Sequence, residues 1–413
     1  MASPLNDPLP RVLFCTSQIP QSIYAGCMQL FRSLQGYPGE KLMVMGPAPE
    51  SDAQILPCRY ETNRLLIYRL RCTRFGEWVT GVNSLNVLPE LGLSRSTRIA
   101  REFAPDLVVT VMDHLSYYKH AWALSRRLKA GLVTITMDDP QAFEQAHPWL
   151  ERAYVRFLKR LYGDAVLSLG VSREMCDYLQ LRFGKPSTVF HFGPSDGMRS
   201  RDAKESGSLQ SPGTLTLGYA GAMSLGYHDG ILAILPALEQ TGAKLVVYTR
   251  DQGFLVRHPQ VVNRGFLPPD ALWSTLQSEC DAVLLPYSFK DDVARIYRTH
   301  FPTKLSEYCW VGMPMLLIGP AYATGIRWGL DHPDAALTAT SPDPVAVAPI
   351  LEQLRTNPAL RIALAANGAE TARLEFDPEK IRERFALHLR EAAAVHHRSM
   401  NNHGCRVRAE PGA

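Results

Sequence analysis

One segment in the second half of the chain carries the residue types that bind an anion. A polar loop holds three cations, Lys290, Arg295 and Arg298, and a helix is expected to begin just after it, with Thr303 as its N-cap. Free backbone N–H groups at a helix start attract anions, and Lys304 adds a positive charge at the same place. The segment therefore predicts a site for an anionic group.

A carboxylate lies in the same expected helix. Glu307 comes one turn inside it, where a carboxylate can accept two hydrogen bonds from neighbouring hydroxyl groups, as when a protein holds a ribose. Alternatively, Lys304 and Glu307 form only an i,i+3 surface pair, worth a few tenths of a kcal/mol. Residue types alone leave both interpretations open.

A second pair of acids follows an apolar strand expected at Leu132–Met137. Asp138 and Asp139 could position an acceptor hydroxyl group, or they could cap the following turn. No metal site is predicted, because the eight cysteines contain no Cys-x-x-Cys pair and no Asp-x-Asp motif stands in a suitable context. We expect the cysteines to be buried as small apolar side chains.

The segment Arg59–Arg74 has a local excess of positive charge. Its arginines alternate with apolar residues, and Glu61 is its only acid. An amphipathic basic helix here would make peripheral contact with anionic lipid or with a lipid-diphosphate acceptor. The alternative is a solvated helix face whose arginine stems cover apolar surface.

These candidates must be positioned by strands that alternate with helices. Short continuous apolar runs, typical of strands covered on both faces, recur on either side of a polar stretch rich in Gly, Ser and Pro. This pattern predicts an α/β fold with parallel sheets, and ligands beyond the carboxyl ends of the strands. The expected divisions are an N-terminal domain at 1–193, a linker at 194–213, a C-terminal domain at 214–376, a closing helix at 377–395 and a disordered tail at 396–413.

Composition narrows the functional classes. The 413 residues are 46% hydrophobic and carry a net charge of +4, which is globular and too weakly basic for a dedicated nucleic-acid partner. No apolar run reaches the roughly 18 residues of a spanning helix, and the start lacks a secretory signal. We therefore expect a cytoplasmic protein, with a peripheral contact at the inner face of the membrane as a further hypothesis.

The sequence FPTKLSEYCWVGMPMLL closely resembles the donor-binding segment of GT-B glycosyltransferases of the glycosyltransferase-4 (group 1) type, which often reads FPxKLxEYxAxGxPV. Four further segments resemble the same family. They are LGYAGAMSLGYHDGILAILPAL, QVVNRGFLPPDALWSTL, PDLVVTVMDHLSYYKHAWAL and AVLSLGVSREMCDYL. The resemblance covers most of the chain and implies two Rossmann-like domains facing a central cleft. It also implies a nucleotide-sugar on the C-terminal domain and the acceptor on the N-terminal one.

In the C-terminal domain, the resemblance assigns roles residue by residue. Glu307 corresponds to the second acid of a paired-acid motif that grips the ribose, and Lys304 to a cation near the diphosphate. The N–H groups of Thr303–Leu305 would face the phosphates or the sugar. Gly221 corresponds to the glycine that lets the first loop approach the donor, and Phe266 to a position beside the nucleobase.

In the N-terminal domain, Gly26 would lie in the loop after the first strand and permit close backbone approach. The ring of His114 would face the donor sugar, which makes His114, Lys304 and Glu307 the implied catalytic residues.

The chain departs from the family at several positions. Thr299 stands where the first acid is expected, Ala222 replaces the usual arginine, and the usual lysine later in that loop is His228 or missing. Arg295, Arg298 or Arg250 could compensate from neighbouring loops. Alternatively, the donor is held differently or the site is inactive.

The resemblance implies transfer of a sugar from a UDP- or GDP-sugar to a hydroxyl group of a saccharide or lipid-linked acceptor. It implies retention of configuration without a metal or other cofactor, in polysaccharide or glycolipid biosynthesis. The departures favour a second hypothesis, a non-catalytic protein of the same fold that binds a sugar nucleotide or a partner enzyme.

Overall fold

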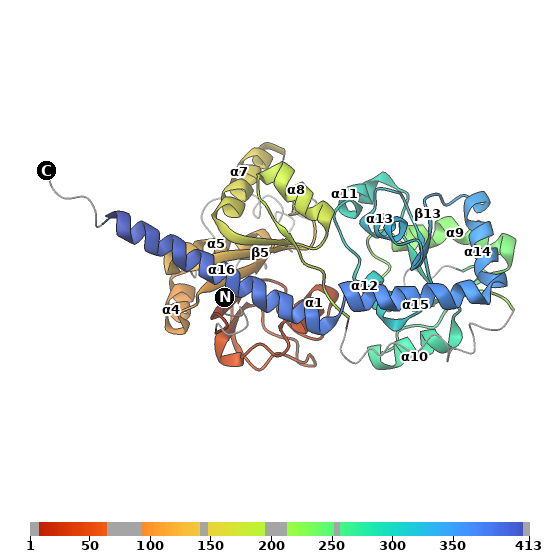
Figure 1. The fold of residues 1–413 in the computed structure, drawn as a ribbon, viewed down its shortest axis with the longest axis horizontal. Helices are drawn as coiled ribbons and strands as arrows, with labels where there is room; N and C mark the ends of the chain where they lie inside the picture. Colours follow the sequence, from red (N-terminus) through yellow and green to blue (C-terminus); the bar gives the residue numbers. More distant parts are fainter. Residues whose placement is uncertain (1–7, 64–92, 141–147, 195–212, 252–256, 408–413) are drawn as a thin grey trace. The chain divides into compact units, whose positions relative to one another are not determined.

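The computed structural model describes residues 8–63, 93–140, 148–194, 213–251 and 257–407. The chain divides into two compact units (Figure 1). The first unit comprises Met1–Phe192 with Glu379–Ala413, and the second comprises Gly193–Pro378. Most of the predicted linker, most of the basic segment and the last six residues lie outside the described residues.

The first unit is built on a sheet of seven parallel strands, in the order β3-β2-β1-β4-β5-β6-β7. The central strands are buried along their whole length, as their continuous apolar runs predict. The strands are β1 (Val12–Cys15), β2 (Leu42–Gly46), β3 (Arg59–Thr62), β4 (Leu107–Val111), β5 (Gly131–Thr136), β6 (Ala165–Gly170) and β7 (Thr188–Val189).

Helices surround this sheet and form two apolar clusters with it. One cluster joins β1 and β2 to α4 and α5, and the other joins α5, α7 and α8. The helices of the unit are α1 (Ala25–Leu34), α4 (Leu93–Phe103), α5 (Leu115–Leu128), α7 (Pro148–Asp164), α8 (Arg173–Phe183) and α16 (Pro378–Val407). Ser172 caps α8, since its side chain accepts the Met175 N–H at 2.9 Å, as predicted.

The second unit repeats the design with six parallel strands, in the order β10-β9-β8-β11-β12-β13. The strands are β8 (Thr216–Ala220), β9 (Lys244–Tyr248), β10 (Val261–Asn263), β11 (Ala282–Pro286), β12 (Met315–Ile318) and β13 (Ala336–Ala339). The helices are α9 (Tyr227–Thr241), α10 (Pro269–Glu279), α11 (Ala294–Tyr297), α12 (Thr303–Val311), α13 (Thr324–Asp331), α14 (Pro344–Thr356) and α15 (Pro358–Glu375).

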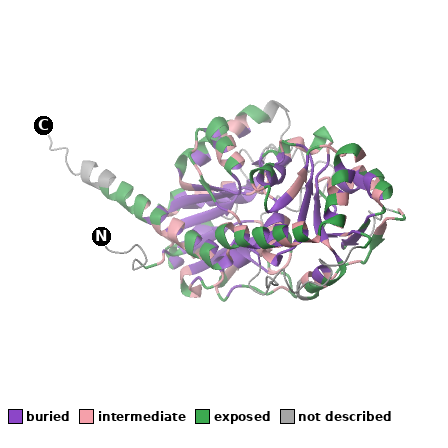
Figure 2. Cartoon of the chain, turned by 45° about the vertical axis from the view of Figure 1, so that its right-hand side comes forward, coloured by how far each residue is buried: buried purple, intermediate pink, exposed green. Residues whose placement is uncertain are grey.

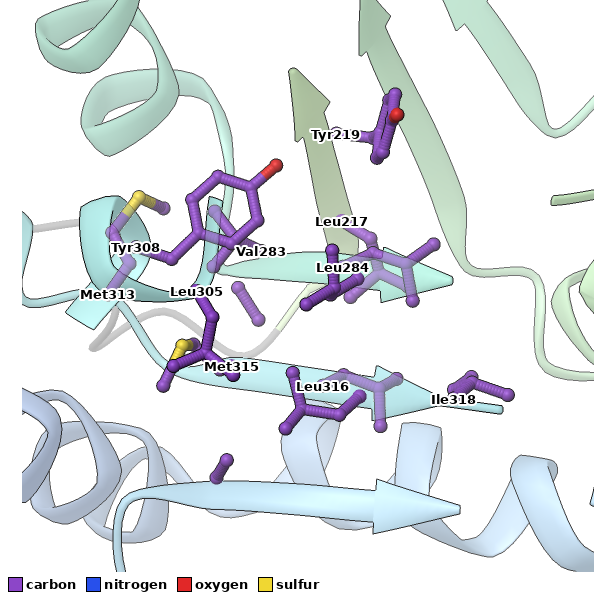
Figure 3. Packing of buried hydrophobic residues seen from close by; sticks show 14 of the residues in the cluster. Leu217, Tyr219, Val283, Leu284, Leu305, Tyr308, Met313, Met315, Leu316 and Ile318 are labelled. Atoms are coloured by element: carbon purple, nitrogen blue, oxygen red, sulfur yellow. The ribbon is translucent and has the colours of Figure 1, made fainter. Parts of the chain in front are cut away.

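The core of the second unit lies between this sheet and its helices. Leu305 and Tyr308 of α12 reach toward the apolar residues of β8, β11 and β12 (Figure 3). Buried residues follow the strands, whereas exposed residues line the outer helix faces (Figure 2). The sheet therefore provides a rigid support for the loops at its carboxyl edge.

Two expectations about particular segments are wrong. Arg59 lies in strand β3 and pairs with Glu61 at 2.7 Å, so the basic segment does not begin as a helix. The tail expected to be disordered from 396 is helical through Val407. There the His396 ring nitrogen Nε2 donates a hydrogen bond to the Lys129 carbonyl at 2.9 Å, and His397 lies 3.4 Å from Asp106. Both histidines therefore hold α16 against the first unit.

The cysteines and the apolar helices were also the subject of expectations. Cys15, Cys27, Cys280 and Cys309 are buried free thiols, as predicted, whereas Cys58 and Cys176 are half-buried. Of the helices in the described part of the chain, none is long and apolar enough to cross a membrane.

Candidate functional site

Gly221 begins the loop after β8, and its backbone conformation requires glycine. Its φ is +131°, which L side chains rarely adopt. A Cβ atom there would lie 2.4 Å from Cε of Lys304, so the lysine fills the space that a side chain would take. The structure thus brings together two of the predicted donor-site residues that lie far apart in the second unit's sequence.

Lys304 lies in an aromatic setting. Its Nζ atom is 4.3 Å from the ring centroid of Tyr227 and 5.5 Å from that of Tyr219. Burial lowers the pKa of Lys304 to about 8, although the charges of Glu307 and Asp251 oppose this shift. An anion bound here would restore the charged form, because an opposite charge favours it.

Helix α12 holds Lys304 and Glu307 at its start. Its N-cap is Pro302 and Thr303 is the first helical residue, so the prediction of Thr303 as N-cap is wrong by one position. Gly312 ends the helix in the left-handed conformation, as expected. Tyr308 ties the helix to β8, since its hydroxyl group accepts the Ala220 N–H at 3.0 Å.

The residues of this helix that are predicted to bind the donor differ in how exposed they are to a ligand. Thr303, Lys304 and Glu307 are all half-buried, whereas Leu305 is fully buried. The Leu305 N–H donates to the Pro302 carbonyl at 3.1 Å, so it already has an acceptor within the helix. Thr303 and Lys304 are therefore the better placed of the three backbone candidates.

A cavity of about 240 Å³ opens beside Gly221. Phe266, predicted to lie beside a nucleobase, forms part of its wall, with the Arg250 guanidinium stacked 3.7 Å from the Phe266 ring centroid. The Asp251 carboxylate, also in the wall, accepts the Met223 N–H at 2.7 Å and so fixes the neighbouring loop. The lining residues are Gly221, Ala222, Tyr248, Thr249, Arg250, Asp251, Phe266, Leu267 and Leu272. Flat apolar and guanidinium surfaces suit an aromatic base.

The loop before α12 packs against the loop after β8. The Tyr297 hydroxyl group accepts the Ser288 N–H at 3.2 Å and donates to the Leu225 carbonyl. Lys290 pairs with Asp229 of α9 at 2.8 Å, so this cation already has a carboxylate partner. These contacts hold the arginine-bearing loop beside the loop that begins at Gly221.

The two arginines of this loop are exposed. The guanidinium of Arg298 lies 4.5 Å from the Tyr322 ring centroid, and Arg295 lies on the short helix α11. Thr299, at the position of the expected acid, is only 5% exposed.

The predicted residues of the first unit lie at the carboxyl ends of β1 and β4. His114 is the N-cap residue of α5, is 5% exposed, and meets Tyr117 edge-on at 5.8 Å. Gly26 is the second residue of α1, so the expectation of a loop position is wrong. A Cβ at Gly26 would collide with the Gln18 side chain, so the group that approaches this glycine closely is the Gln18 side chain.

Sequence reasoning missed a polar cluster next to His114. The Ser17 hydroxyl group, just after β1, donates a hydrogen bond to the Asp113 carboxylate, just after β4. Burial raises the pKa of Asp113 to about 6, although hydrogen bonds from Ser17, from backbone N–H groups and from Gln18 lower it. Only the adjacency of Asp113 to His114 could have suggested this site, because Ser17 is 96 residues away in the chain.

The two acids predicted to bind an acceptor have different surroundings. Asp139 is 1% exposed and accepts the Tyr178 hydroxyl group at 2.8 Å, a contact that ties β5 to α8. Asp138 is half-buried. Asp138 is therefore the more accessible candidate of the pair.

Among the residues that the structure describes, no group of three or more His, Cys, Asp or Glu side chains is placed to hold a metal ion.

Comparisons with known proteins identify the fold. No family model and no curated protein matches the sequence. Among solved structures, sucrose-phosphate synthase from Thermosynechococcus elongatus matches with a TM-score of 0.68 and 15% identity, over 94% of this chain and 100% of that one. HepE from Anabaena, in complex with UDP and glucose, matches with a TM-score of 0.62 and 17% identity, over 91% and 98%. A glycosyltransferase from Rickettsia africae matches with a TM-score of 0.61 and 9% identity, over 95% and 99%.

These matches agree with the arrangement of the two parallel sheets and their flanking helices. The chain has the GT-B fold of these glycosyltransferases, as its sequence predicted.

Proposed function

We propose that this protein is a glycosyltransferase that moves a sugar from a nucleotide-sugar to an acceptor hydroxyl group. The proposal rests mainly on one arrangement in the second unit. The Lys304 side chain packs over Gly221, and Gly221 lines a cavity whose wall includes Phe266 and Arg250. A cation next to a flat apolar cavity suits a nucleoside diphosphate. HepE, of the same fold, has been solved with UDP and with UDP-glucose.

Within this proposal, the donor is held by parts of the second unit. The base occupies the cavity against Phe266, and the carboxylate of Glu307 accepts hydrogen bonds from the ribose hydroxyl groups. Lys304 and the N–H groups at the start of α12 meet the diphosphate. Gly221 leaves the space that Lys304 needs.

Catalysis then rests on stabilising the leaving group. The diphosphate gains negative charge as the glycosidic bond breaks, so a fixed cation stabilises the transition state more than the ground state. Arg295 and Arg298 supply the additional positive charge that Ala222 cannot. We propose retention of configuration, with a donor phosphate oxygen removing the acceptor proton and His114 orienting the donor sugar, and without a metal or other cofactor.

The acceptor is assigned to the first unit, with Asp138 as the more accessible of the two predicted acids. We propose a saccharide or a lipid-linked sugar, as in polysaccharide or glycolipid biosynthesis, at a cytoplasmic location. The segment Arg59–Arg74 would provide the peripheral membrane contact, and nearly all of it lies outside the described residues.

A panel of UDP-, GDP- and ADP-sugars tests this function. Calorimetry measures binding of each donor, and a hydrolysis assay with and without simple saccharide acceptors measures turnover. One donor should bind and be turned over in preference to the others. Failure of every donor to bind would overturn the proposal.

The second candidate is a non-catalytic GT-B protein that binds a sugar nucleotide or a partner enzyme. Thr299 and Ala222 favour it, because they remove an acid and a cation expected near the donor. Tight binding of a nucleotide-sugar without turnover, across the panel and with acceptors, would support this candidate instead.

A further inference from the structure

Helix α13 of the second unit ends in a group of contacts around a histidine. His332 is the C-cap residue of α13, and its ring stacks on Trp328 with 4.4 Å between the ring centroids. Its Nδ1 atom lies 2.8 Å from the Trp328 carbonyl oxygen, and its Nε2 atom lies 3.2 Å from Oε1 of Glu375. Both of these oxygens are acceptors, so a ring that donates to both carries a proton on each nitrogen. The geometry therefore favours a charged imidazolium at His332.

Glu375 is the last residue of α15 and contacts α13 through both of its carboxylate oxygens. Oε2 accepts the Trp328 indole N–H at 3.0 Å, while Oε1 faces His332. The side chains of His332 and Glu375 are 30% and 34% exposed, so their ion pair is partly screened by solvent. The contacts join the end of α15 to the end of α13.

The residue after Glu375 extends this arrangement toward helix α12. Phe376 is fully buried, and its ring centroid lies 6.3 Å from that of Trp328 and 5.9 Å from that of Phe301. Phe301 directly precedes Pro302, the N-cap of α12. The end of α15 therefore packs against the segment from which α12 begins.

The first residue of α13 contacts the same segment. The Thr324 hydroxyl group donates a hydrogen bond to the His300 carbonyl. Helix α13 is thus tied to the segment before α12 directly, through Thr324, and indirectly, through Trp328 and Phe376. All of these contacts lie within the second unit (Figure 1).

We propose that His332 and Glu375 are positioning residues for the donor site, and that their pairing makes nucleotide binding depend on pH. The pair fixes α13 and Phe376, and these fix the segment before α12. The first N–H groups of α12 and Lys304 are the groups proposed to meet the diphosphate, so the inference rests on the proposed function.

The charged groups around the pair set the direction of the pH dependence. Loss of the Nε2 proton leaves a lone pair of His332 facing the Glu375 carboxylate, so the contact weakens as the pH rises. Cys309 of α12 also faces this carboxylate, but burial, followed by the charge of Glu375, raises the pKa of the thiol well above its usual range and keeps it neutral. The exposed charged residues nearest to the pair on α13, on α15 and in the turn after α13 are Arg327, Asp331, Asp334 and Arg373.

The test compares the wild type with Glu375→Gln by calorimetry of UDP or GDP binding, whichever the donor panel selects, at about pH 6 and about pH 8.5. The glutamine oxygen still accepts the Trp328 N–H, and its amide donates to a neutral His332, so this variant keeps the contact at the higher pH. The ratio of the wild-type dissociation constant to that of Glu375→Gln should rise about threefold between the two pH values, as expected of a partly exposed ion pair. Lys304 is present in both proteins, so its own titration cancels in the ratio.

Two other variants complete the comparison. At about pH 6, His332→Ala should bind the nucleotide about threefold more weakly than the wild type. Glu391→Gln makes the matched substitution in a second histidine–glutamate pair, with His388 at 3.6 Å on α16, and should bind like the wild type at both pH values.

The charge on the ring is measured without any ligand. Long-range 1H–15N NMR, with the His332 signals assigned by their absence from His332→Ala, should show both ring protons persisting to a higher pH in the wild type than in Glu375→Gln. Loss of the second proton at the same pH in both proteins would contradict the pairing.

A constant ratio of dissociation constants, or wild-type affinity in His332→Ala at about pH 6, would overturn the positioning role. Either result leaves the proposed function standing, because the nucleotide still binds. Failure of every nucleotide to bind the wild type at both pH values would instead reject the proposed function and this inference with it.

Discussion

The two units share one architecture, yet the charges at the carboxyl edges of their sheets are opposite. In the first unit, burial raises the pKa of the Asp113 carboxyl group to about 6. In the second, burial lowers the pKa of the Lys304 ammonium to about 8. Both shifts have the same cause, since a low-dielectric setting disfavours whichever form is charged.

The difference indicates what each edge is built to bind. A poorly solvated cation gains most from an anion such as a diphosphate, whereas a poorly solvated carboxylate gains most from hydrogen-bond donors such as sugar hydroxyl groups. Each unit therefore has one ionisable side chain whose charged form burial disfavours.

Removing the cation of the second unit should have the largest effect. Lys304→Met keeps the apolar stem over Tyr219 and Tyr227 and deletes the charge. Loss of a contact between a charged lysine and a phosphate costs about 2–5 kcal/mol, so kcat/KM for the donor should fall by roughly thirtyfold or more.

The matched control is Lys244→Met, which removes an exposed lysine at the start of β9 in the same unit. It should leave kcat/KM unchanged. Equal kinetics for Lys304→Met and the wild type would show that the diphosphate does not meet this lysine.

Glu307→Ala should come next. The carboxylate is expected to accept charge-assisted hydrogen bonds from the ribose, each worth about 1.5–3 kcal/mol. The dissociation constants of the nucleotide and the nucleotide-sugar should both rise by about tenfold or more, with an unchanged circular dichroism spectrum. Unchanged constants for both ligands would remove Glu307 from the site.

The arginines of the loop before α12 should have a smaller effect. Arg295→Ala and Arg298→Ala, measured separately, are expected to lower kcat/KM by about tenfold in at least one case, or about 1.4 kcal/mol. The contact strengthens as the leaving group gains charge, so kcat should fall as well as affinity. If neither variant reaches this effect, the loop does not replace the cation missing at Ala222.

The smallest expected effect is on stability in the first unit. Since the folded-state pKa of Asp113 lies above its unfolded value of about 3.9, the folded protein binds this proton more tightly, and stability falls as the pH rises from about 4 to 6. Solvent around the half-buried side chain reduces the effect to about 1 kcal/mol. Asp113→Asn should therefore raise the melting temperature at pH 7.5 but not at pH 4, by calorimetry. A gain that is equal at both values would contradict the assignment.

Local sequence patterns predicted the layers of the fold well. Apolar runs such as Ala282–Pro286 and Lys244–Tyr248 mark strands with their observed bounds, because burial on both faces requires apolar side chains throughout. Strand β3 was missed because its exposed and half-buried residues, Arg59 among them, follow no such run. Edge strands carry less of the apolar signal.

Contiguous site residues could be predicted from the sequence, whereas contacts between distant segments could not. The start of α12 could be recognised because its residues are contiguous and form one motif. The pairing of Ser17 with Asp113, and the closure of Lys304 over Gly221, depend on the order of strands in each sheet. Residue spacing in the sequence does not reveal such contacts.

Proton uptake on nucleotide binding tests the central claim most directly, that Lys304 is a poorly solvated cation awaiting an anion. Since burial lowers the pKa of Lys304 to about 8, part of the Lys304 population is uncharged at pH 8 before binding, and a bound diphosphate should protonate it. Calorimetry in two buffers of different ionisation enthalpy, with the nucleoside diphosphate selected by the donor panel, should show net proton uptake in the wild type and none in Lys304→Met. Tight binding by the wild type without uptake, or the same uptake in the variant, would contradict the account.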